Sequence, residues 1–171
     1  MRTTALLKIA ALGMIALLAA CGGPSKFKTY SGPPVTQIVV DKSERKMWLL
    51  SGSTAIKQYD IGLGNEPVGD KFIEGDGKTP EGNYFIDRRN PNSQYHLSIG
   101  VSYPDPRDVV EAAAFGRPPG GDIFIHGRGP EGNAKVGSNW DWTAGCITIS
   151  DDEIEDVYAM VRDGTPIQIN P

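Results

Sequence analysis

The chain has 171 residues, of which 39% are hydrophobic and 22% charged, and its 17 Lys and Arg against 21 Asp and Glu give a net charge of −4. This length fits one domain, and the composition excludes a disordered chain, a collagen and a multi-pass membrane protein. No basic stripe is present, so we expect no nucleic-acid partner. The 21 Gly and 13 Pro favour many turns between short strands over a helical bundle.

Residues 1–20 are predicted to be a signal peptide. Arg2 and Lys8 precede an uncharged run that ends at Ala20; this run is too short to span a membrane and has the length of a signal-peptide core. The small residues before Cys21 resemble the bacterial lipobox. By that resemblance Cys21 becomes the first residue of the exported protein and carries lipid. We therefore expect a location in the cell envelope, with the lipid as the protein's only membrane contact.

Residues 21–34 contain Gly-Gly-Pro-Ser and Ser-Gly-Pro-Pro segments, which are typical of a flexible tether. The folded domain is then expected at 35–171. If Cys21 carries lipid, Cys146 has no disulfide partner, since the chain has two cysteines. A Cys21–Cys146 disulfide is the alternative.

The domain is predicted to be mainly β, an antiparallel sandwich or partly open barrel with two short helices. β-Branched and apolar runs bounded by turn residues predict strands at 35–41, 46–50, 55–61, 83–87, 95–103, 122–126, 146–150 and 165–170. One helix is expected at 105–115, and a second is expected to begin at the capping box of Ser150 and Glu153 and to end at Gly164. Residues 127–145 are expected to form a long functional loop.

Two other chemistries lack support in the sequence. The Gly-Lys-Thr at 77–79 is not a phosphate-binding loop, which needs a glycine five residues before Gly77, because position 72 is Phe. The chain has two histidines, His96 and His126, on separate predicted strands and without the ligand spacing of a zinc site. We therefore expect no metal ion.

Cys146 and His126 form the remaining candidate catalytic site. Cys146 begins a predicted strand directly after Gly145, and His126 ends another predicted strand. Catalysis by a cysteine nucleophile needs a base that takes the thiol proton and N–H donors for the oxyanion. A tight Gly-Cys turn exposes the sulfur, and a histidine at a strand end beside a long loop can reach it. An inert buried thiol is the alternative.

The order of these segments resembles the L,D-transpeptidase (YkuD-type) catalytic domain. That family has a histidine followed, after a similar interval, by Ser/Thr-His-Gly-Cys, and here His126 is followed by Thr-Ala-Gly-Cys at 143–146. Ala144 stands where the family usually has histidine, and Thr148 where many members have arginine. Further segments that resemble family motifs lie at 39–43, 47–49, 78–84 and 90–104.

The resemblance implies a mainly β fold and a peptidoglycan stem peptide as substrate. Cys146 would attack the carbonyl of the third residue of the stem, His126 would accept the thiol proton, and the Gly127 carbonyl would orient the histidine ring. Backbone N–H groups of Gly145 and Cys146 would hold the oxyanion. No metal or organic cofactor is implied.

Thr143, Arg128 and Trp142 are candidate substrate contacts. Thr143 alternatively supports the cysteine turn, Arg128 is alternatively a solvated charge, and Trp142 alternatively pins the long loop by burial. A hydrolase that uses the same cysteine and histidine, and a non-catalytic wall-binding lipoprotein, are the alternative functions. We expect a monomer.

Overall fold

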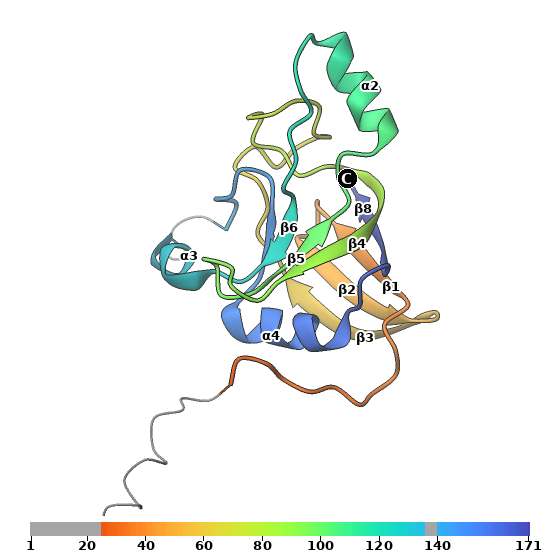
Figure 1. Ribbon diagram of the computed structural model, residues 1–171, viewed down its shortest axis with the longest axis vertical. Coiled ribbons are helices and arrows are strands. Elements are labelled where there is room, and N and C mark those ends of the chain that lie inside the picture. The colour runs from red at the N-terminus through yellow and green to blue at the C-terminus, as the bar shows by residue number, and fades with distance from the viewer. Residues whose placement is uncertain (1–24, 136–139) are drawn as a thin grey trace, which may run out of the picture.

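One curled sheet of eight strands forms the scaffold of the protein (Figure 1). The computed structural model describes residues 25–135 and 140–171. The strand order is β3-β2-β1-β8-β4-β5-β6-β7. The strands are β1 (Gln37–Asp41), β2 (Lys46–Ser51), β3 (Thr54–Asp60), β4 (Gly82–Asn90), β5 (Ser98–Val101), β6 (Phe124–His126), β7 (Ile147–Thr148) and β8 (Pro166–Asn170).

The prediction of a mainly β fold is confirmed, and most neighbouring strands are antiparallel as expected. The sheet is nevertheless mixed, because β1 pairs with β8 and β6 pairs with β7 in parallel. The strand expected at 95–103 is shorter: β5 begins at Ser98, since the preceding residues turn and His96 has a φ of 75°.

Three helices lie within the described residues: α2 (Pro106–Ala114), α3 (Gly129–Lys135) and α4 (Asp151–Met160). Capping boxes at Asp105 and Ser150 begin α2 and α4, as the sequence predicts for α4. α4 ends earlier than expected, because Val161 is already extended. The helix α3 is a difference from the prediction, since it lies inside the segment expected to be a loop; an ion pair of 2.6 Å joins Glu131 to Lys135 along it.

The core lies on the concave face of the sheet. Residues alternate between buried and more exposed along β1, β2 and β8, as expected of strands with one buried face. α4 lies across one end of the curled sheet, with Ile154, Val157 and Met160 buried against it, whereas α2 projects at the opposite end of the molecule (Figure 1). No helix in the described part of the chain is long and apolar enough to cross a membrane.

Part of the segment expected to be a flexible tether, residues 25–30, lies along α4 (Figure 1). Lys28 donates hydrogen bonds to Asp152 (2.7 Å) and Asp156 (2.9 Å) on that helix. The Phe27 and Tyr158 ring centroids are 6.1 Å apart. The acidic face of α4 thus provides partners that composition alone does not reveal. We call residues 25–30 the N-terminal strap; the predicted signal peptide and Cys21 lie outside the described residues.

A buried lysine fixes the long segment between β3 and β4. Lys42 is 2% exposed, and its ammonium donates to the carbonyls of Gly69 (2.6 Å) and Thr79 (2.9 Å) and to the Glu81 carboxylate (2.7 Å). Gly69 lies in the first half of this segment, and Thr79 and Glu81 lie near its end. The lysine therefore holds that segment against the sheet, where it contacts the turn before Cys146.

Replacing Lys42 with methionine should lower the free energy of unfolding by about 3 kcal/mol, because one partly buried carboxylate and two carbonyls lose their donor. Urea unfolding measures this change. Lys46→Met is the matched control: Lys46 pairs with Asp60, whose side chain is 68% exposed, so we expect a loss below about 1 kcal/mol. Equal losses in the two variants would contradict the role given to Lys42.

Candidate active site

His126 is the last residue of β6, and its side chain is 2% exposed. Its Nδ1–H donates a hydrogen bond of 2.5 Å to the carbonyl oxygen of Gly127. Because the neutral ring carries one proton, this bond leaves Nε2 as the acceptor. The Gly127 carbonyl therefore selects the tautomer in which Nε2 can accept a proton.

Two aromatic side chains enclose the imidazole. Tyr95 stacks on it with ring centroids 4.5 Å apart and an interplanar angle of 25°, and Trp142 meets it edge-on at 5.9 Å. Burial lowers the pKa of His126, while the hydrogen bond to Gly127 and the charge of Asp151 act in the opposite direction. The ring is therefore neutral near pH 7.

Cys146 directly precedes β7 and is half-buried. Its Sγ lies 3.4 Å from the carbonyl oxygen of Asp122, to which the thiol donates. Burial raises the pKa of the Cys146 thiol, although the N–H of Phe124 acts in the opposite direction. At rest the site thus holds a neutral thiol and a neutral imidazole rather than an ion pair.

The pairing of β6 with β7 brings the two groups together. The register aligns Ile125 with Ile147 and His126 with Thr148. Side chains two residues apart in a strand share a face of the sheet, so Cys146 lies on the face of Thr148 and His126. Both line one cavity of about 450 Å³. Its other walls come from Asn90, residues 92–95, Ser98, Asp122 and Phe124.

The turn before Cys146 is built around Thr143. The Thr143 hydroxyl donates to the Cys146 carbonyl (2.7 Å) and accepts from the Gly145 N–H (3.1 Å). Gly145 has a φ of 139°, and a Cβ there would lie 2.7 Å from the carbonyl oxygen of Lys78. The turn therefore needs glycine at 145.

This turn bears on two expectations. Thr143 is 6% exposed and does not line the cavity, and its hydroxyl supports the cysteine turn. The Gly145 N–H already has a partner in Thr143, whereas no hydrogen bond from the Cys146 N–H is found in the described part of the chain. Cys146 therefore offers the unoccupied donor beside the sulfur.

Arg128 and Trp142, the other candidate substrate contacts, do not line the cavity either. The Arg128 guanidinium lies 4.5 Å from the centroid of the Trp140 ring. Trp142 packs behind the site, against His126 and Tyr95. Both side chains thus support the wall of the site instead of facing its interior.

Comparison with known protein families identifies the domain that carries this site. The L,D-transpeptidase catalytic domain (YkuD) family matches residues 35–169. The chain belongs to this family. No curated protein matches the chain in sequence.

Solved structures of L,D-transpeptidases and related proteins share the fold. The helical cell shape determining protein Pgp2 from Campylobacter jejuni aligns with a TM-score of 0.61 and 26% identity, over 82% of this chain and 48% of that one. Bd1075 from Bdellovibrio bacteriovorus aligns with a TM-score of 0.55 and 24% identity, over 84% and 50%. An L,D-transpeptidase from Mycobacterium smegmatis aligns with a TM-score of 0.54 and 19% identity, over 82% and 60%. The chain thus spans about half the length of Pgp2 and Bd1075.

Sequence reasoning missed several parts of this L,D-transpeptidase domain's site. Tyr95 stacks on His126, and Asp122 accepts from the thiol. The carboxylate of Asp151, at the start of α4, accepts from the N–H groups of Arg128 and Gly129, both at 2.8 Å. Asp151 had one available signal, because it follows the predicted capping residue Ser150. Tyr95 lies in the segment 90–104 that resembles a family motif, but nothing in the sequence placed its ring on His126, and Asp122 had no signal for its contact with the thiol. Within residues 25–135 and 140–171, no cluster of three potential ligands could hold a metal ion.

Substituting Gly145 with alanine should disrupt the cysteine turn, because the added Cβ approaches the Lys78 carbonyl at 2.7 Å. We expect a loss of at least about 2 kcal/mol of stability and a slower reaction of Cys146 with iodoacetamide. Gly116→Ala is the control: its φ is also positive, at 64°, but a Cβ there meets open space. That variant should lose only about 1 kcal/mol and keep the reactivity of Cys146.

The raised pKa of Cys146 predicts a thiol that is slow to alkylate at neutral pH, because only the thiolate reacts and its fraction falls as the pKa rises. In a Cys21→Ser variant, Cys146 is the single thiol of the chain. Its rate of reaction with iodoacetamide should rise with pH, with a midpoint above the value of about 8.5 typical of a free cysteine. A midpoint below that of a cysteine peptide would contradict the neutral resting pair.

Proposed function

We propose that this protein is a cysteine-dependent L,D-transpeptidase that acts on peptidoglycan stem peptides. The observation that carries the proposal is the position of Cys146 and His126 on one cavity, with the Nδ1–H of His126 bound to Gly127. Membership of the L,D-transpeptidase catalytic domain family supports the same reaction. The similar protein Pgp2 is named for helical cell shape, which supports a role in shaping the cell wall.

In the first step Cys146 attacks the carbonyl carbon of the third residue of the donor stem. Nε2 of His126 accepts the thiol proton as the C–S bond forms, since the resting thiol is neutral. The tetrahedral oxyanion accepts a hydrogen bond from the Cys146 N–H. The bond to the terminal D-alanine then breaks, and the imidazolium returns the proton to the leaving amine. A thioester on Cys146 remains.

In the second step an amine of another stem attacks the thioester, and His126 takes a proton from that amine. The product is a cross-link, and Cys146 returns as the thiol. A hydrolase is the second candidate, in which water takes the place of the amine. Ala144 favours this candidate, because it is exposed beside Cys146 and its small side chain leaves the thioester open to water. A purely wall-binding protein has no need of the Cys146–His126 pair.

We further propose that the protein is exported and anchored to a membrane by lipid on Cys21. The apolar run before Cys21 and its small residues support this location. Mass spectrometry of the protein purified from membranes should find a lipidated N-terminal cysteine. Cys21→Ser should release the folded domain from the membrane fraction, and retention of that variant in the membrane would count against lipid anchoring.

Defined muropeptides test the reaction itself. Incubation with disaccharide tetrapeptides should give dimers for a transpeptidase, or tripeptides with water added to the new carboxyl group for a hydrolase. Cys146→Ser should abolish both products and the thioester adduct, because a hydroxyl is a far poorer nucleophile near neutral pH. Its melting temperature should stay within a few degrees of the parent value, because the two side chains are nearly isosteric. Full activity of Cys146→Ser would contradict the assignment of Cys146 as the nucleophile.

Ala144→His should change the partition between amine transfer and hydrolysis, because a larger side chain beside Cys146 narrows the approach to the thioester. We expect the ratio of dimer to tripeptide to change by about threefold or more, with little change in melting temperature because the position is exposed. The ratio is read from the muropeptide products by mass spectrometry. An unchanged ratio and rate would show that position 144 has no part in acceptor choice.

A further inference from the structure

The loop between β4 and β5, residues 91–97, forms a wall of the active-site cavity. Asn92, Ser93, Gln94 and Tyr95 line the cavity, and Tyr95 also stacks on His126. The position of this loop therefore fixes one face of the proposed catalytic base.

The loop has few hydrogen bonds of its own. Within it, the N–H of Tyr95 donates to the Ser93 hydroxyl (3.2 Å) and the N–H of Leu97 to the Tyr95 carbonyl (3.0 Å). These are local turns that shape short pieces of the loop. At its base the loop is closed by the pairing of Asn90 with Ser98 between β4 and β5.

Lys26 of the N-terminal strap adds a second link between the two arms of the loop, next to this pair. Its ammonium donates to the carbonyl of Pro91 (2.7 Å) and to the carbonyl of His96 (3.0 Å). One charged group thus bridges the start and the end of the loop. Hydrogen bonds from a charged donor are stronger than those from a neutral donor.

The strap is itself held in place by α4. Lys28, two residues from Lys26, binds Asp152 and Asp156 on that helix. The hydrogen bond to Asp152 is the largest cause of the raised pKa of Lys28, which keeps the side chain charged. The loop is fixed to the same helix, since Nε2 of His96 lies 2.8 Å from the Glu155 carboxylate. Lys26 is therefore placed beside the loop before any substrate arrives.

We propose that Lys26 is a positioning residue for His126. It touches neither the cavity nor the imidazole; it links the two arms of the loop, the loop orients Tyr95, and the Tyr95 ring holds the imidazole by stacking. The strap that follows the predicted lipidation site thus contributes to the geometry of the active site. The effect of Lys26 on turnover rests on the proposed function, whereas its effect on the position of the His126 ring does not.

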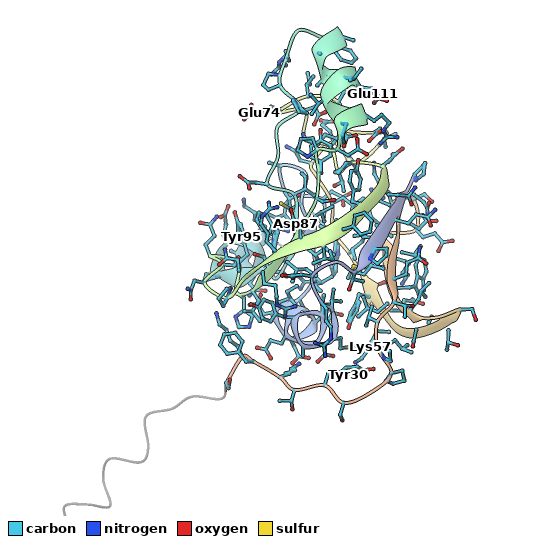
Figure 2. All side chains as sticks on the ribbon, turned by 45° about the vertical axis from the view of Figure 1, so that its right-hand side comes forward. Tyr30, Lys57, Glu74, Asp87, Tyr95 and Glu111 are labelled. Carbon is cyan, nitrogen blue, oxygen red and sulfur yellow. The ribbon has the colours of Figure 1, made fainter. Side chains whose placement is uncertain are left out.

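The chain offers a sharp test, because its two histidines give separable ring signals in NMR. The test uses Lys26→Met, which keeps the aliphatic stem, and Lys26→Arg, which can still bridge two carbonyls, both in the full-length protein. Lys57→Met is the matched control. Lys57 pairs with Asp156 of α4 at 2.9 Å, but it lies near Tyr30 and far from Tyr95 (Figure 2).

Lys26→Met should shift the ring resonances of His126, because the ring current of Tyr95 changes when the stack loosens. Lys57→Met should leave them in place, although the two variants lose similar amounts of stability. With muropeptides, Lys26→Met should lower kcat by about tenfold with a smaller change in KM, since small displacements of catalytic groups are costly. Lys26→Arg should restore most of the rate.

Unchanged His126 resonances in Lys26→Met would overturn the proposal, as would shifted resonances with an unchanged kcat. An equal shift in Lys57→Met would also overturn it, because the effect would then come from α4 in general. If the parent protein does not process muropeptides while Lys26→Met still shifts the His126 signals, the proposed function fails and the positioning of the imidazole stands.

Discussion

The parallel pairing of β6 with β7 is the contact on which the site depends. β7 has two residues, yet its register with β6 places Cys146 on the same face as His126. A shift of one residue would turn the sulfur to the opposite face. Gly62 holds β7 from its other side through reciprocal hydrogen bonds of 2.9 Å with Thr148. A Cβ at Gly62 would lie 2.0 Å from the Trp140 carbonyl, so this support requires glycine.

Burial around the pairing of β6 with β7 sets the protonation states of Cys146 and His126. It raises the pKa of Cys146 and lowers that of His126, so both groups stay neutral. A neutral thiol reacts slowly with oxidants and electrophiles. In the proposed mechanism the proton moves to His126 only as Cys146 attacks, and the hydrogen bond from Nδ1–H to Gly127 leaves Nε2 as the acceptor.

The sequence by itself predicted a mainly β fold, the helices α2 and α4, and Cys146 and His126 as the candidate reacting residues. Alternation of apolar and polar residues along β1 and β8 reflects one buried face, and Ser150 with Glu153 marks the start of α4. Cys146 and His126 could be named because Gly145 and the adjoining strands give local signals, and because their order resembles a known family. Local signals of this kind depend only on neighbours in the chain.

The tertiary structure alone decided what surrounds those residues. Tyr95 reaches His126 from the β4–β5 loop, and Lys26 reaches that loop from a position 65 residues away from Pro91. The composition of the strap is that of a flexible tether, whereas the acidic face of α4 gives its Lys28 two partners. Thr143 and Trp142 likewise face the protein rather than the cavity. Such contacts join segments distant in sequence, so they follow from the packing of the sheet and α4 and leave no local pattern in the chain.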